Sequence, residues 1–177
     1  MRKLVCAITG RKETSPRYTA ETAEAARVAG RLAAELGLVV LTGGLSGVME
    51  RAAEGAKSAR GSTIGILPGS AHADANRFID YVLPSGLGIA RNCLIASACD
   101  LMIALPGGTG TVEEICFALD FDRPVISWGS FEIEGVRKVE FPNERKLKEA
   151  LQALIDEKFR KLTPGTDSQG ADAWTPQ

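Results

Sequence analysis

The chain has 177 residues, of which 45% are hydrophobic and 24% are charged, and these proportions are typical of one globular domain with its own core. A formal net charge of −1 argues against binding to long nucleic acids or anionic membranes, because both partners usually require a basic surface. No apolar stretch approaches the roughly 20 residues that span a bilayer, so we expect a cytoplasmic protein without a membrane partner.

Apolar runs and helical periodicities alternate along the chain. In order they predict strand 3–9, helix 19–36, strand 38–41, helix 46–59, strand 62–67, strand 78–83, helix 88–99, strand 100–105, helix 110–120, strand 124–128 and helix 143–160. Residues 130–141 are ambiguous and are compatible with a hairpin. We expect residues 1–162 to form a single nucleotide-binding domain and the polar residues 163–177 to form a disordered tail.

The expected strands are continuous apolar runs rather than alternating patterns, which indicates strands that are covered on both faces. Together with the β-α alternation, this predicts an α/β fold: a three-layer sandwich in which helices cover both faces of a mostly parallel sheet of six or seven strands. Ligands of such sheets bind beyond the carboxyl ends of the strands. The sequence therefore directs attention to the segments that follow each strand.

Three of the expected strands end in turns that contain glycine, and all three turns would lie on that edge. The residues that become candidate ligand contacts in the first two turns are Gly43, Gly44, Pro68 and Gly69. The third turn is the beginning of the segment Pro106-Gly-Gly-Thr-Gly-Thr-Val-Glu-Glu114, which follows the buried run 100–105. The convergence of three turns is stronger evidence for a site than any single turn.

The third turn opens a helix, so unpaired N–H groups and the positive end of the helix dipole point at one spot. Such a spot favours an anion, most often a phosphate, and glycines let the phosphate approach the backbone closely. The candidate contacts are Gly107, Gly108, Thr109, Gly110 and Thr111. The alternative is a tight strand-to-helix connection that binds no ligand.

Two carboxylates and one arginine are the candidate chemical groups. Glu114 is either a functional acid or the end of a capping box that begins at Thr111. Glu113 is the weaker candidate, because adjacent helical residues point about 100° apart. Arg91 interrupts an apolar helix and needs a partner if it is buried, which could be Glu114, a ligand phosphate or both. At a helix end it would instead be a surface residue. Asn92 either caps that helix or contacts the ligand.

Other chemistries fit the sequence poorly. Glu113 replaces the third glycine of a dinucleotide-binding fingerprint. No lysine lies in a glycine-bearing turn, as a pyridoxal-phosphate decarboxylase would require. The single histidine, His72, makes a metal site improbable. The four cysteines lack Cys-x-x-Cys spacing and are expected to be buried apolar side chains. We therefore expect no metal and no resident cofactor.

The segment from Pro106 to Glu114 resembles the PGGxGTxxE motif of the LOG ("Lonely Guy") family, which was long mislabelled "lysine decarboxylase". Arg91 stands where the family has its arginine, and Gly43, Gly44 and Met49 belong to a segment similar to the family's second-strand turn. The resemblance implies a Rossmann-like homo-oligomer, commonly a dimer. It also implies hydrolysis of the N-glycosidic bond of AMP or of cytokinin riboside 5′-monophosphates, which gives free base and ribose 5-phosphate.

The resemblance assigns roles to particular residues. Glu114 would act at the sugar, and Arg91 would orient Glu114 or bind the base or phosphate. The amides of residues 107–111 would hold the 5′-phosphate, while Gly43, Gly44 and Met49 would line the nucleoside side. The small-molecule partner would then be a nucleotide.

Two positions depart from the plant-type enzymes, which usually have an aromatic residue at Thr109 and often a lysine at Asn92. The Arg91-Asn92 pair and residues 85–90 look more like a sister branch that includes molybdenum-cofactor carrier proteins. The alternatives are therefore a non-catalytic carrier of a phosphorylated ligand such as the molybdenum cofactor, or a domain that only senses nucleotides. Glu114 favours catalysis, because a carrier needs no carboxylate at a reacting carbon.

Overall fold

The structure of the protein is a computed structural model that describes residues 2–162. The tail predicted for residues 163–177 lies outside the described residues. None of the helices within residues 2–162 is both long and apolar enough to cross a membrane.

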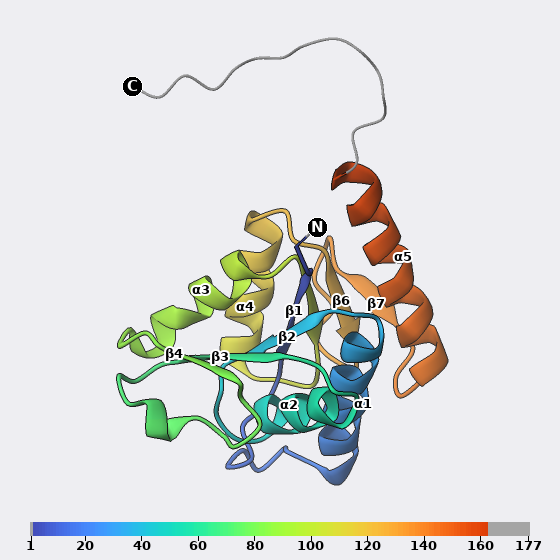
Figure 1. Ribbon diagram of the computed structural model, residues 1–177. Coiled ribbons are helices and arrows are strands. Elements are labelled where there is room, and N and C mark those ends of the chain that lie inside the picture. The colour runs from blue at the N-terminus through green and yellow to red at the C-terminus, as the bar shows by residue number, and fades with distance from the viewer. Residues whose placement is uncertain (1, 163–177) are drawn as a thin grey trace, which may run out of the picture.

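A seven-stranded sheet forms the centre of the described chain (Figure 1). Its strands are β1 (Val5–Thr9), β2 (Val39–Thr42), β3 (Thr63–Leu67), β4 (Tyr81–Pro84), β5 (Leu101–Ala104), β6 (Val125–Trp128) and β7 (Arg137–Val139). Their order is β4-β3-β2-β1-β5-β6-β7, and every neighbouring pair is parallel. The predicted α/β class is thus confirmed, and β1 is the central strand.

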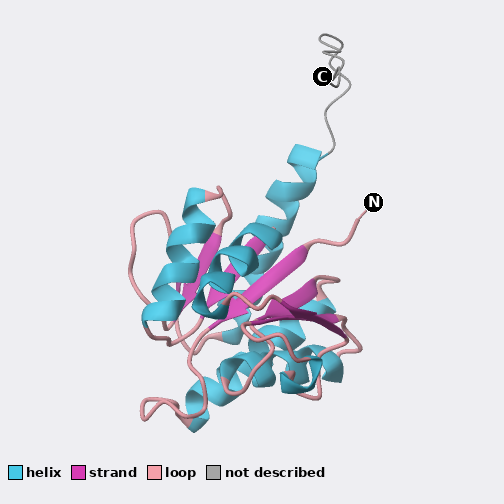
Figure 2. Cartoon of the chain, turned by 90° about the vertical axis from the view of Figure 1, so that its left-hand side faces the viewer, coloured by secondary structure: helices cyan, strands magenta, loops and turns pink. Residues whose placement is uncertain are grey.

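Helices cover both faces of this sheet, as Figure 2 shows. On one face lie α1 (Ala20–Glu35), α2 (Val48–Ser58) and α5 (Glu144–Leu162), and on the other lie α3 (Arg91–Ala98) and α4 (Thr109–Asp120). Strand β1 serves both cores, because Cys6 and Ile8 pack toward α1 and α2, whereas Ala7 packs toward α3 and α4. This double burial explains the continuous apolar runs of the strands.

Residues 130–141 do not form the hairpin with which their sequence is compatible. The segment contributes one strand, β7, which pairs in parallel with β6 from Ile126 opposite Arg137 to Trp128 opposite Val139. Of the residues of β7 only Val139 is buried, so the strand lies at the sheet edge with little apolar pattern to reveal it.

The predicted helix 88–99 begins later than expected, at Arg91. Gly86 and Gly88 have φ angles of 67° and 57°, which an α-helix cannot contain, and the segment η2 (Gly88–Ala90) forms a single 3₁₀ turn instead. Because of this turn, Arg91 is the first α-helical residue and lies at the carboxyl edge of the sheet.

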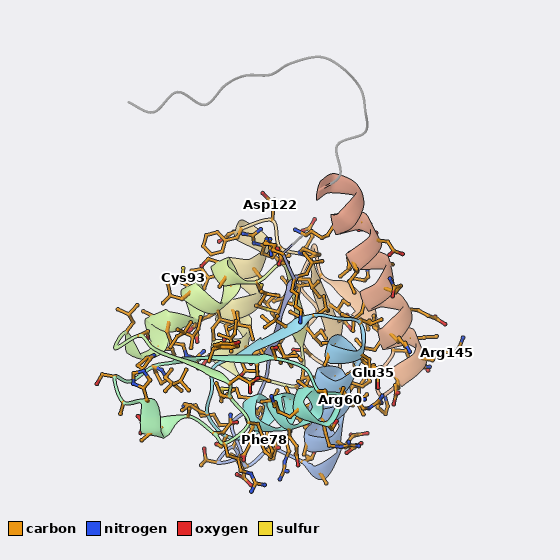
Figure 3. All side chains as sticks on the ribbon, in the orientation of Figure 1. Glu35, Arg60, Phe78, Cys93, Asp122 and Arg145 are labelled. Atoms are coloured by element: carbon orange, nitrogen blue, oxygen red, sulfur yellow. The ribbon has the colours of Figure 1, made fainter. Side chains whose placement is uncertain are left out.

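The opposite edge of the sheet is formed by the turns that follow the helices. Arg60 and Asp122, both labelled in Figure 3, have φ angles of 58° and 54° in the turns after α2 and α4. These are the left-handed positions that commonly end a helix, and here they are filled without glycine.

Candidate functional site

A cavity of about 450 Å³ opens at the carboxyl ends of the central strands. It lies beside β1, whose neighbours are β2 on one side and β5 on the other. The helix that follows β1 covers one face of the sheet and the helix that follows β5 covers the other, so the connections diverge at this point. Such a divergence is the usual ligand position in open parallel sheets.

Segments that are far apart in the sequence meet in the cavity wall. The predicted site residues that line it are Gly43, Met49, Pro68, Arg91, Asn92, Gly108, Thr109, Gly110, Thr111 and Glu114. The structure thereby brings the three glycine-bearing turns together around one space, as their common edge predicts.

Three other predicted contacts, Gly44, Gly69 and Gly107, are not among the lining residues. A side chain at Gly44 would point at Leu67, one at Gly69 would point at Asp74, and one at Gly107 would point at Thr111. These glycines shape their turns, and the cavity is formed by their neighbours.

The end of β1 and the loop after it supply lining residues that were not predicted from the sequence. They are Ile8 and Thr9 of the strand and Gly10, Arg11, Lys12, Thr14 and Ser15 of the loop. The loop is fixed at both sides, because the Arg11 N–H donates to the carbonyl of Pro106 at 3.2 Å and the Val48 N–H donates to the carbonyl of Arg11 at 2.9 Å. The available signal was topological: a charged loop after the central strand of a parallel sheet lies at the ligand edge whatever its glycine content.

Glu114 is a buried carboxylate at the wall of the cavity, with 7% of its surface exposed. Its Oε2 accepts a hydrogen bond from the Thr9 hydroxyl, and its Oε1 accepts one from Nη1 of Arg91 at 3.1 Å. The capping box does not form, because α4 begins at Thr109 with Gly108 as a cap that makes no side-chain bond. Thr111 therefore lies inside the helix, and the carboxylate points across to β1 and α3.

Arg91 is not the surface arginine of the alternative interpretation. It is 7% exposed and forms an ion pair with Glu114, and Nη1 also donates to Oδ1 of Asn92 at 2.9 Å. Its buried Nε has no hydrogen-bond partner within residues 2–162. A guanidinium has five N–H donors, so this side chain retains donors for a molecule in the cavity.

Asn92 extends the network to the second carboxylate. Its Nδ2 donates to Oε2 of Glu113 at 2.8 Å, which ties α3 to α4. Glu113 does not line the cavity, in keeping with the different directions of adjacent helical residues. Of the two acids in the motif, Glu114 is the one that faces the enclosed space.

Burial sets the electrostatics of the pair. It raises the pKa of Glu114, and the hydrogen bond from Thr9 and the charge of Arg91 oppose that rise only in part. Burial likewise lowers the pKa of Arg91, against the attraction of Glu114. A carboxyl group whose pKa lies above its ordinary value is better matched to proton transfer near neutral pH than an exposed one.

The beginning of α4 lies next to Glu114 and has the features of an anion cradle. The first turn of an α-helix has N–H groups without intrahelical acceptors, and here Thr109 and Gly110 of that turn line the cavity. At Gly108, an added β-carbon would have no atom within 4 Å, so its backbone faces open space. Arg11 and Lys12 add positive charge to the same cavity. The arrangement suits a phosphate group with an acid beside it.

Comparison with known proteins places the chain in a family. The model of the SLOG cluster4 family matches residues 3–159, and the chain belongs to this family. An uncharacterized protein from Archaeoglobus fulgidus is 42% identical over 125 residues, which cover 70% of this chain and 82% of that protein.

Solved structures of similar fold include two proteins that handle the molybdenum cofactor (Moco). The molybdenum cofactor binding protein of the phototrophic bacterium Rippkaea orientalis has a TM-score of 0.79 and 32% identity, covering 88% of this chain and 99% of that chain. The Moco carrier protein of Chlamydomonas reinhardtii has a TM-score of 0.79 and 28% identity over the same shares. The resemblance to a LOG-like family near these carriers is thus confirmed.

Proposed function

We propose that the chain hydrolyses the N-glycosidic bond of a nucleoside 5′-monophosphate, AMP or a cytokinin riboside monophosphate, to free base and ribose 5-phosphate. The observation that carries this proposal is the position of Glu114. It is a buried carboxylate that faces a cavity of about 450 Å³, and it belongs to α4, the helix that begins directly after Gly108. A carrier needs no carboxylate at a reacting carbon, whereas a hydrolase does.

The chemistry follows from the charges that develop in the sugar. The 5′-phosphate would bind the amides at the beginning of α4, with the sugar toward Glu114. When the bond between C1′ and the base nitrogen breaks, its electron pair leaves with the base and the sugar gains positive charge. Ionised Glu114 stabilises that charge and accepts a proton from the attacking water, whose oxygen bonds to C1′. The departing base takes up a proton from solvent, and Glu114 then releases the proton that it accepted, which restores the ionised carboxylate.

Arg91 has a supporting role in this proposal. Its guanidinium is too basic to give up a proton readily, so it serves as a hydrogen-bond donor. Nη1 holds Oε1 of Glu114, and because Arg91 lines the cavity, its guanidinium would also donate to the phosphate or to the departing base. Gly43 and Met49 would then line the nucleoside side of the cavity.

The second candidate is a carrier that binds the molybdenum cofactor as cargo without converting it. The supporting observation is the similarity to the Rippkaea orientalis protein, which covers nearly all of that chain at 32% identity. In this case the same cradle would hold the phosphate of the cargo, and the pair formed by Glu114 and Arg91 would be structural.

One assay separates the two candidates. The purified protein is incubated with AMP and with N6-isopentenyl-AMP, and the products are separated by chromatography. A hydrolase releases base and ribose 5-phosphate in equal amounts, at a rate proportional to protein concentration. A carrier releases neither, and instead co-purifies with a coloured or fluorescent pterin that is freed on denaturation. Absence of base release from every nucleotide tested would exclude the hydrolase.

A further inference from the structure

We infer that Thr9 is a positioning residue for Glu114: its hydroxyl holds Oε2 of the carboxylate against the end of β1 in both protonation states. This inference rests on the proposed hydrolysis for its catalytic meaning, because it concerns the acid that the hydrolysis uses. Thr9 is not part of the motif and is not one of the residues that carry the resemblance, and it lies 105 residues from Glu114 in the chain.

Thr9 is among the most firmly held residues at the site. It is the last residue of the central strand, it is paired with Ala104 of β5, and it is 3% exposed. Its carbonyl accepts the N–H of Leu105 at 2.9 Å. A β-branched side chain has few rotamers available, so its hydroxyl is fixed relative to the sheet. The sheet thereby determines where Oε2 lies.

The two oxygens of Glu114 have chemically different partners. Oε1 is bound by Arg91, which can donate but never accept. Oε2 is bound by a hydroxyl, which donates to a carboxylate and accepts from a carboxylic acid after a rotation about its C–O bond. A proton taken from water therefore resides on Oε2, where the O–H bond it forms still has an acceptor. The hydrogen bond persists while its direction reverses.

Removal of the Thr9 hydroxyl should change the pKa of Glu114 more than it changes the affinity for the ligand. The charged groups around Glu114 are Arg91 from α3, Glu113 from its own helix and, from the loop after β1, Arg11 and Lys12 in the same cavity. All of them are retained in a Thr9→Val variant. What is lost is a donor that favours the ionised carboxylate, so the pKa of Glu114 should rise further.

The test compares three variants by their pH profiles. Thr9→Val should lower kcat by about 10- to 100-fold, in line with an unpaired buried acceptor, with KM changed by less than about threefold. The acid limb of kcat/KM should move to higher pH. Thr9→Ser retains the hydroxyl and should recover most of the lost activity and the original acid limb.

Thr63→Val is the matched control. Thr63 is a fully buried threonine whose hydroxyl donates to the carbonyl of Phe78, outside the cavity. This variant should lower the melting temperature without moving the acid limb. A Thr9→Val enzyme that loses activity with an unmoved acid limb would overturn the inference and leave Thr9 a structural residue.

A second measurement does not depend on turnover. With ¹³C-labelled glutamate, the carboxyl resonance of Glu114 is identified by its absence in Glu114→Gln, and its titration midpoint is compared in wild type and Thr9→Val. The midpoint should be higher in the variant, and equal midpoints would contradict the inference. If wild type releases no base, the proposed hydrolysis fails while this comparison still decides the role of Thr9. If Thr9→Val does not fold, Thr9→Ala takes its place. Misfolding of both, with Thr63→Val folded, would assign Thr9 a structural role only.

Discussion

The turns after β2 and β5 have similar sequences, Thr42-Gly43-Gly44 and Pro106-Gly107-Gly108. They differ in the atoms that lie next to their glycines. In the first turn the protein itself fills the space. A β-carbon at Gly43 would meet the guanidinium of Arg91 and would lie 2.7 Å from Sδ of Met49. Gly44 has a φ of 73° with Leu67 against it. Both glycines are therefore explained by packing and backbone conformation.

In the second turn the two glycines differ from one another. A β-carbon at Gly107 would lie 2.6 Å from Cγ2 of Thr111, so packing requires glycine there. Gly108 has an ordinary φ of −123° and no atom within 4 Å of its missing β-carbon. Nothing within residues 2–162 requires glycine at Gly108, and the space it leaves faces the cavity. Of the four glycines in the two turns, Gly108 is the one that has no close neighbour within the described residues.

The largest effect is expected at the acid beside this second turn. Glu114→Gln keeps an amide oxygen for Arg91 and an N–H group for Thr9, so the fold should persist. Without a carboxylate, kcat for base release should fall by about 10²- to 10⁴-fold, while AMP affinity stays within severalfold. Chromatographic rates and calorimetric titration measure the two quantities. Glu113→Gln, on the acid that bonds Asn92, is the control and should lose far less. Full activity of Glu114→Gln would end the catalytic assignment.

The next effect concerns stability. Gly107→Ala would force its methyl group against Thr111, which is buried. Overpacking of this kind should lower the free energy of unfolding by about 3 kcal/mol. Urea denaturation followed by circular dichroism measures it. A variant as stable as wild type would show that the turn relaxes easily, and the contrast with Gly108 would disappear.

Gly108→Ala should leave stability nearly unchanged and weaken ligand binding instead. The backbone conformation suits alanine, and the small gain from a stiffer unfolded chain is offset by a poorer helix cap, so stability should stay within about 1 kcal/mol of wild type. The methyl group would occupy the approach to the cradle and weaken AMP binding by roughly 10- to 100-fold, or about 1.4 to 2.7 kcal/mol. Calorimetry with AMP gives the affinity. Unchanged affinity would place the phosphate elsewhere.

The smallest effect is a shift of the wild-type pH profile. Burial raises the pKa of Glu114, and the proposed hydrolysis uses the ionised form. Activity should therefore be present above that pKa and be lost as the pH falls through it. The acid limb of kcat/KM should therefore have its midpoint above the value of about 4.3 that is ordinary for glutamate. Initial rates between pH 4 and pH 8 measure it. A midpoint at or below the ordinary value would contradict the assignment.

How much the sequence could predict differs between these regions. The β5–α4 turn was predictable, because a buried apolar run that is followed directly by Pro106-Gly107-Gly108 has few possible structures other than a strand and a turn. The orientation of Glu114 was not, since a capping box and a site acid share one spacing and differ only in where α4 begins. Thr9 carries no local signal, because its role depends on a helix that follows more than 100 residues later. Strand β7 escaped prediction, as it buries only Val139.

The cavity has walls on both sides of β1: Gly43 and Pro68 belong to the β2–β3 half of the sheet, and Gly108 and Glu114 follow β5. A bound molecule would contact both halves at once and would therefore stabilise the middle of the sheet. At a concentration one hundred times its Kd, such a molecule adds about 2.7 kcal/mol to the free energy of unfolding. The melting temperature of the intact chain is therefore a direct screen for its ligand, even when no product is formed.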